Sequence, residues 1–122
     1  MLQQINKILY QGVDDELAFI ITDNATPPVA RDISTATFTF TAYHNATGDV
    51  LQKTLGSGLA LGTAKDGQLA ALFTADEMTI APLTYAYQLF MTITVSAVTT
   101  TTLEAWGYLQ VEPGRIIEEV SP

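Results

Sequence analysis

Residues 84–95 read Thr-Tyr-Ala-Tyr-Gln-Leu-Phe-Met-Thr-Ile-Thr-Val, and residues 36–43 read Ala-Thr-Phe-Thr-Phe-Thr-Ala-Tyr. Both stretches alternate with a period of two and are built from aromatic residues, β-branched residues and threonine, which is typical of half-buried strands. Alternate side chains of a strand point to opposite faces. The core face of the longer strand is therefore predicted to carry Tyr85, Tyr87, Leu89 and Met91. Such a pattern favours a domain that packs and binds over one that catalyses.

Turn-forming sequences divide the rest of the chain into short segments of the same kind. Strands are expected at residues 5–11, 16–22, 36–44, 50–55, 59–61, 68–74, 84–95 and 102–112, with a Thr-rich turn at 96–101. One short helical turn is expected near residues 75–81, where Thr74 and Glu77 have the spacing of a capping box. Turn signals every 8–12 residues or so predict one all-β domain, an antiparallel sandwich or barrel of seven to eight strands.

The charge and composition of the chain exclude several classes of partner and site. The chain of 122 residues carries 13 acidic residues against 5 Lys and Arg, a net charge of −8. Nucleic-acid binding needs a basic patch, so no nucleic-acid partner is expected. No membrane partner is expected either, because no apolar stretch approaches the ~20 residues of a membrane span and no signal peptide is visible at Met1. The absence of cysteine excludes disulfides and thiolate metal sites.

The residue types that support catalysis are sparse. His44 is the only histidine, and no Gly-x-Ser-x-Gly sequence provides a nucleophile elbow. The acidic run 14–16 lacks the spacing of a calcium loop and is interpreted as a solvated turn. Asp76 and Glu77 are interpreted as acids favoured in the first turn of a helix rather than as an acid–base pair. We therefore expect no enzyme activity, no catalytic residue, no metal site and no cofactor.

Three aromatic residues are expected on the face that points away from the core. Phe90 lies opposite Leu89 in the alternation, and Trp106 and Tyr108 follow if Leu109 points inward. Exposed aromatic residues indicate an interface, since Trp and Tyr are enriched there. The alternatives are that an end loop covers them or that the facing is shifted by one residue. Tyr85 follows the corner at Pro82 and is expected to donate its hydroxyl to backbone, as in a tyrosine corner.

Several motifs together resemble one protein family. They are the Gly-Val-Asp-Asp turn at 12–15 before a strand, Arg-Asp-Ile-Ser-Thr-Ala at 31–36, Pro-Leu-Thr-Tyr-Ala-Tyr-Gln-Leu at 82–89 and Trp-Gly-Tyr-Leu-Gln-Val-Glu-Pro-Gly at 106–114. Over roughly residues 10–114 the chain resembles the immunoglobulin-like domains of tailed-phage virion proteins. It is similar to the N-terminal domain of phage baseplate upper proteins, and to head-fibre and capsid decoration proteins.

The resemblance implies an immunoglobulin-like β-sandwich over residues 1–114 and a C-terminal tail, residues 115–122, that contacts a neighbouring subunit. It implies a non-enzymatic structural component of the virion, assembled in the bacterial host cytoplasm, with other virion proteins as partners and a homo-oligomeric state. Only eight residues follow Gly114, which favours a small capsid decoration or head accessory protein. The alternatives are a tail or baseplate accessory protein and a glycan- or receptor-binding surface module.

The expected contacts between subunits involve both ends of the chain and the outward aromatic residues. The tail is polar except for aliphatic side chains that a neighbouring chain would bury, and the first strand offers an edge for strand addition. The predicted interface residues are Ile5, Phe90, Trp106, Tyr108, Ile116, Ile117 and Val120.

Overall fold

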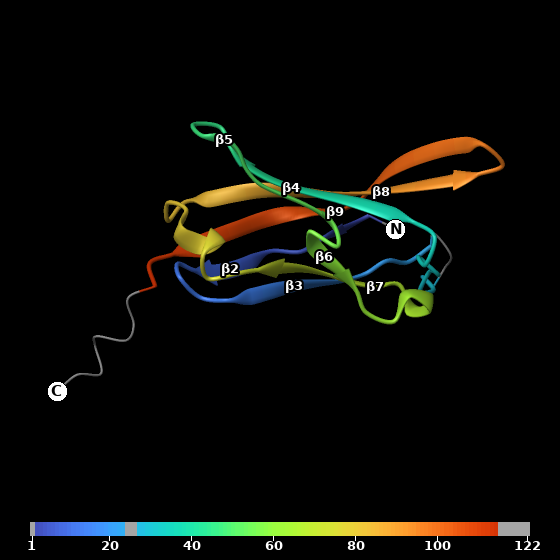
Figure 1. Cartoon of the computed structure of the whole chain (residues 1–122), viewed down its shortest axis with the longest axis horizontal. Helices are drawn as coiled ribbons and strands as arrows, with labels where there is room; N and C mark the ends of the chain where they lie inside the picture. Colours follow the sequence, from blue (N-terminus) through green and yellow to red (C-terminus); the bar gives the residue numbers. More distant parts are fainter. Residues whose placement is uncertain (1, 24–26, 115–122) are drawn as a thin grey trace.

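The computed structural model describes residues 2–23 and 27–114, and within them it is almost entirely β-structure (Figure 1). The strands are β1 (Gln3–Gln4), β2 (Lys7–Tyr10), β3 (Asp15–Ile20), β4 (Thr37–His44), β5 (Gly48–Leu55), β6 (Gly58–Leu61), β7 (Gln68–Phe73), β8 (Thr84–Val95) and β9 (Val98–Glu112). Two 3-10 turns, η1 (Ala64–Asp66) and η2 (Glu77–Thr79), interrupt them. In this part of the chain no helix is long and apolar enough to cross a membrane.

The strands form one continuous sheet that curls over into two layers. Its order is β1-β9-β8-β4-β5-β6-β7-β3, and β2 also pairs with β9. In Figure 1, β4, β8 and β9 lie above β3 and β7, and β6 crosses between the layers. Among the described strands the two ends of this order do not pair with each other, so the expected sandwich is confirmed and these strands do not close into a barrel. Not every pair is antiparallel, because β1 and β2 run parallel to β9 and β5 runs parallel to β6.

The core lies where the inward faces of the two layers meet. The alternation in the sequence predicted these faces, and every residue assigned to the core face of β8 is buried. Phe40 lies at the centre, with its ring stacked on Tyr87 at 5.1 Å and edge-on to Phe73 at 6.0 Å. Phe19 adds a second contact between the layers, 6.1 Å from the Tyr87 ring. Each such ring pair contributes about 0.5–1.5 kcal/mol beyond the area it buries.

Two buried tyrosine hydroxyls tie peripheral segments to this core. The Tyr85 hydroxyl donates to the Ala81 carbonyl at 2.7 Å, so the predicted tyrosine corner is confirmed. The Tyr87 hydroxyl donates to the Ile5 carbonyl, also at 2.7 Å, and anchors the segment between β1 and β2. A buried hydroxyl needs such a partner. Removal of these groups from water raises the pKa of both tyrosines.

The final hairpin differs from the sequence-based expectation. Its turn consists of Ser96 and Ala97 alone, with φ of 50° and 65°, and β9 begins at Val98 rather than at residue 102. The threonines assigned to a turn lie in the strand and pair across the hairpin. The hydroxyl oxygens of Thr92 and Thr101 are 3.0 Å apart, and those of Thr94 and Thr99, nearer the tip, are 2.9 Å apart. Threonine favours strands, so its abundance was a strand signal.

Candidate interaction surface

The outer face of the layer made by β4, β8 and β9 carries the predicted aromatic residues. The register places side chains in rows across the three strands. The rows are Tyr43–Ala86–Tyr108, then Thr41–Gln88–Trp106, then Thr39–Phe90–Leu103. The facing predicted for Phe90, Trp106 and Tyr108 is therefore the one that the structure shows.

A hollow opens in this face because a small residue lies between two large ones. Ala86 separates Tyr43 from Tyr108, and Gln88 and Trp106 occupy the next row. These five residues line most of a cavity of about 350 Å³. We call them the aromatic hollow. Pockets for small ligands are of similar volume, and an interface anchor needs a recess of this kind.

Hydrogen bonds from the N-terminal segment fix the part of β9 that carries Trp106 and Tyr108. The backbone N–H of Tyr108 donates to Asn6 Oδ1 at 3.0 Å, and the Trp106 carbonyl accepts from the Ile5 N–H at 3.0 Å. The Trp106 and Tyr108 rings meet edge to face, with centroids 6.1 Å apart. Tyr108 is 45% exposed, while Trp106 is half-buried. The pair therefore presents a rigid aromatic edge to solvent.

This face has little charge for a protein of net charge −8. The outward residues of β4 and β8 are threonine, alanine, glutamine, tyrosine and phenylalanine. On β9 the outward positions from Thr99 to Gln110 are also uncharged, and Glu112 follows at the strand end. Charged residues are depleted and aromatic residues enriched at the centres of protein interfaces. The surface can accept apolar or hydroxyl-bearing groups without the removal of ions from water.

The other predicted interface residues are placed differently. Ile5 is half-buried and packs against the hydrophobic core, and its carbonyl and N–H both bond to the sandwich. Ile116, Ile117 and Val120 lie outside the described residues. Ile5 thus serves first to fix the edge of the sheet, and the involvement of the tail stays a prediction.

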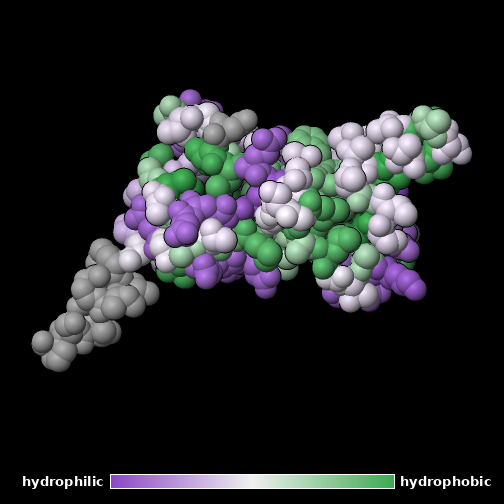
Figure 2. Space-filling view, viewed as in Figure 1, coloured by the Kyte–Doolittle hydropathy of each residue, from purple (hydrophilic) through white to green (hydrophobic). Residues whose placement is uncertain are grey.

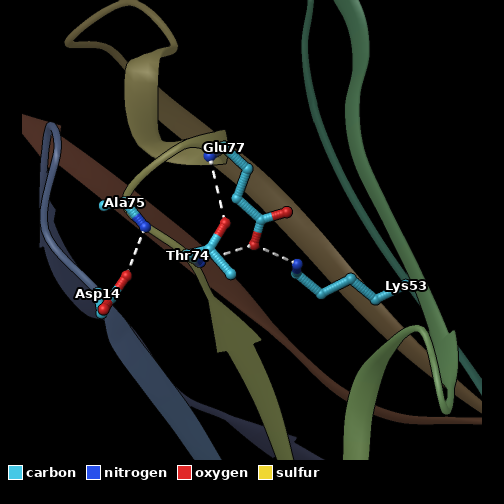
Figure 3. A network of polar contacts seen from close by, with 5 residues as sticks. All are labelled: Asp14, Lys53, Thr74, Ala75 and Glu77. Carbon is cyan, nitrogen blue, oxygen red and sulfur yellow. Dashed lines mark hydrogen bonds and ion pairs between the residues drawn. The ribbon is translucent and has the colours of Figure 1, made fainter.

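Asp14 and Glu77, which the sequence offered for metal binding and for catalysis, have structural contacts (Figure 3). Asp14 accepts from the Ala75 N–H at 2.5 Å, and Glu77 accepts from the Thr74 N–H at 3.1 Å while Thr74 Oγ1 accepts from the Glu77 N–H. The expected capping box is therefore present. Glu77 Oε1 also lies 2.6 Å from Lys53 Nζ. Within residues 2–23 and 27–114, no group of three or more His, Asp or Glu is placed to hold a metal.

His44 likewise has structural contacts, one of them within its own turn. Its Nδ1 accepts from the Ala46 N–H at 3.0 Å, and its ring lies edge-on to Tyr85, with centroids 5.9 Å apart.

The burial of Lys53 was not anticipated from the sequence. Lys53 points inward from β5 and is only 4% exposed, although a lysine between Gln and Thr reads as a surface residue.

No protein-family model and no curated protein matches the chain. Among solved structures, the N-terminal domain of phage TP901-1 ORF48 is similar with a TM-score of 0.60, at 8% identity, over 92% of this chain and 99% of that domain. A chicken T-cell receptor is similar with a TM-score of 0.52, at 14% identity, over 91% of this chain and 55% of the receptor chain. The chain has an immunoglobulin-like fold. At these identities the likeness shows the fold alone, and this immunoglobulin-like fold also occurs in a phage protein.

Proposed function

We propose that this immunoglobulin-like domain is a non-enzymatic structural component of a tailed-phage virion, attached to other virion proteins through the aromatic hollow. The observation that carries the proposal is the end-to-end likeness to the phage ORF48 domain, which covers 92% of this chain and 99% of that domain. The similarity of the sequence motifs to phage virion proteins supports the same assignment. The side chains of Asp14, His44 and Glu77 have structural partners.

The chemistry of the surface supports attachment rather than turnover. Interface hot spots are enriched in Tyr and Trp, and they cluster in recesses from which water is excluded. The aromatic hollow offers such a recess on the face of a paired sheet. A partner would insert an aliphatic or aromatic side chain between Tyr43 and Tyr108.

Within the particle, capsid decoration is the first candidate and a tail or baseplate position the second. The two differ in copy number, because a decoration protein follows the multiplicity of the major capsid protein. Quantitative mass spectrometry of purified particles, with the major capsid protein as reference, distinguishes them. Complete absence of the chain from particles would contradict both.

The role of the aromatic hollow is tested by Tyr108→Ala. Loss of a central tyrosine anchor weakens an interface by about tenfold or more, so incorporation into particles is expected to fall accordingly. Tyr10→Ala is the matched control, since Tyr10 on β2 is 41% exposed and lies outside the aromatic hollow. Equal incorporation of Tyr108→Ala, Trp106→Ala and the control would exclude this surface as the attachment site.

A glycan-binding module is the second candidate function, favoured by one feature of the same surface. Gln88 contributes an amide with donors and acceptors to a hollow that is bordered by the rings of Tyr43, Trp106 and Tyr108. Sugars combine apolar ring faces with hydroxyl groups, which matches such a lining. Binding of the purified chain to host surface polysaccharide, lost in Tyr108→Ala while particle incorporation is unchanged, would favour this function over attachment.

A further inference from the structure

The hairpin of β8 and β9 extends beyond the rest of the sandwich. The last partner of β8 on its β4 side is Thr37, which pairs with Thr92, and the first partner of β9 on its other side is Gln3, which pairs with Ala105. Residues 93–100 therefore form a two-stranded arm with no described strand on either edge. Figure 1 shows this arm projecting from one end of the long axis.

The two faces of the arm differ in chemistry. Its outer face carries the threonine pairs that link the strands. Its inner face continues the core face outward and forms a groove of about 280 Å³ lined by Arg31, Met91, Ile93, Val95, Val98, Thr100 and Thr102. Val95 and Val98 are each 64% exposed, and Figure 2 shows hydrophobic residues along this side of the arm.

An arm of this kind is poorly protected against association. Natural edge strands usually carry charges, prolines or bulges that prevent pairing with other chains. Residues 92–103 contain no charged residue and no proline, and the irregularity in this strand pair lies further back, between Leu89 and Phe90. A two-stranded hairpin is also only marginally stable in water by itself. A partner that covers the groove would bury its apolar side chains and stabilise the hairpin.

We propose that the groove of the arm binds the C-terminal tail, residues 115–122, of a second copy of this chain. The tail has the sequence Arg-Ile-Ile-Glu-Glu-Val-Ser-Pro, in which three aliphatic side chains flank two carboxylates. The aliphatic residues match the valines and isoleucine of the groove. Arg31 is the only charged residue among the seven that line it, and Glu118 and Glu119 supply the complementary charge.

The tail cannot occupy the arm of its own chain. β9 runs for 15 residues from the arm to Glu112, which is about 45 Å at ~3.3 Å per residue. Val120 lies six residues beyond Gly114 and so reaches at most about 22 Å from it. In Figure 1 the C-terminal, red end of β9 and the orange tip of the arm lie at opposite ends of the molecule. The contact therefore joins the tail of one copy to the arm of the next, a head-to-tail arrangement that produces rings or filaments.

Sedimentation velocity of the full chain and two charge-insertion variants tests this contact. The unaltered chain is expected to form species larger than a monomer as its concentration rises. Val98→Asp, in the groove, and Ile117→Asp, in the tail, are each expected to weaken self-association at least tenfold. Thr99→Asp is the matched control on the outer face of the same hairpin and is expected to assemble. Far-UV circular dichroism confirms that each variant is folded.

Mixing the two defective variants gives the decisive result. Val98→Asp retains an intact tail and Ile117→Asp an intact arm, so an equimolar mixture should form a dimer and nothing larger. Assembly of Ile117→Asp alone would show arm-to-arm pairing and would overturn the proposal. A full chain that stays monomeric at all concentrations would overturn it too, because the occupant would then be a different protein. This test needs no phage particle, so its outcome is separate from that of the attachment experiment.

Discussion

Lys53 is a charged side chain inside a sandwich of apolar residues. It is 4% exposed, its Nζ lies 2.6 Å from Glu77 Oε1, and it sits 5.1 Å above the Phe73 ring. A buried ammonium loses its hydration, and the carboxylate and the ring offset that loss. Glu77 is itself oriented by the Thr74 N–H. Gly58 lets the lysine stem pass, since a Cβ there would lie 2.7 Å from Lys53 Cγ.

Removal of Glu77 and removal of Lys53 should lower the free energy of unfolding by different amounts. Glu77→Ala leaves the buried ammonium with only the Phe73 ring as a partner and is expected to lower the free energy of unfolding by about 2–3 kcal/mol, toward the low end of the range because Glu77 is partly exposed. Lys53→Met keeps the packing of the stem and removes the charge, so it should cost about 1 kcal/mol or less. Urea denaturation of both variants measures the difference. A larger cost for Lys53→Met would refute this account.

The sequence could not predict this pair. The inward position of Lys53 follows from its alternation with Leu51, but a lysine in such a position suggests a strand edge rather than a buried charge. Its partner is 24 residues away in the sequence. By contrast, the partner of the Tyr85 hydroxyl lies four residues back, in the corner that Pro82 marks. Local hydrogen bonds were therefore predictable from the sequence, and the distant ion pair was not.

At the scale of elements, the N-terminal strands depend on a glycine of β9. Gly107 has no need of positive φ, but a Cβ at this position would lie 2.0 Å from the Ile5 carbonyl oxygen. That oxygen accepts the Tyr87 hydroxyl, and the Ile5 N–H donates to the Trp106 carbonyl. The close approach thus joins the N-terminal segment, the core and the aromatic hollow at one point.

Gly107→Ala is expected to displace this segment. Overpacking and the loss of the Tyr87 hydrogen bond together should destabilise the protein by about 2–4 kcal/mol. Hydrogen exchange should show loss of protection in β1 and β2. Gly56→Ala is the control, because Gly56 has a φ of 82° and open space around it. That variant is expected to cost about 1 kcal/mol from backbone strain while β1 and β2 stay protected. Equal protection in both variants would contradict this role for Gly107.

The elements themselves were largely predictable, for a physical reason. Strands such as β4 and β8 have one face in the core, so their alternation appears in the sequence, and β8 has the predicted bounds of residues 84–95. The break between β1 and β2 was missed because no proline or glycine marks it. The tip of the β8–β9 hairpin was missed because Ser96 and Ala97 adopt positive φ without the usual Asn-Gly sequence.

At the scale of the whole molecule, the candidate site depends on register between distant strands. The sequence predicted that Phe90, Trp106 and Tyr108 point outward, because that follows from alternation within one strand. It did not predict that Tyr43 and Ala86 complete the aromatic hollow, because their alignment requires the pairing of β4 with β8 and of β8 with β9. The recess therefore belongs to the assembled sheet rather than to any one segment.

The free energy of unfolding of the whole sandwich should fall at alkaline pH because Tyr87 is buried. Burial raises the pKa of this tyrosine above its ordinary value of about 10. Above pH ~10 the unfolded chain therefore releases a proton that the folded chain keeps, and the free energy of unfolding should fall by up to about 1.4 kcal/mol per pH unit. Below that pH the contribution is fully present and does not vary. Urea denaturation at pH 9, 10 and 11 should show this decline, and Tyr87→Phe should reduce it. A Tyr87→Phe variant whose free energy of unfolding fell as steeply with pH as that of the unaltered protein would show that Tyr87 is not the group responsible.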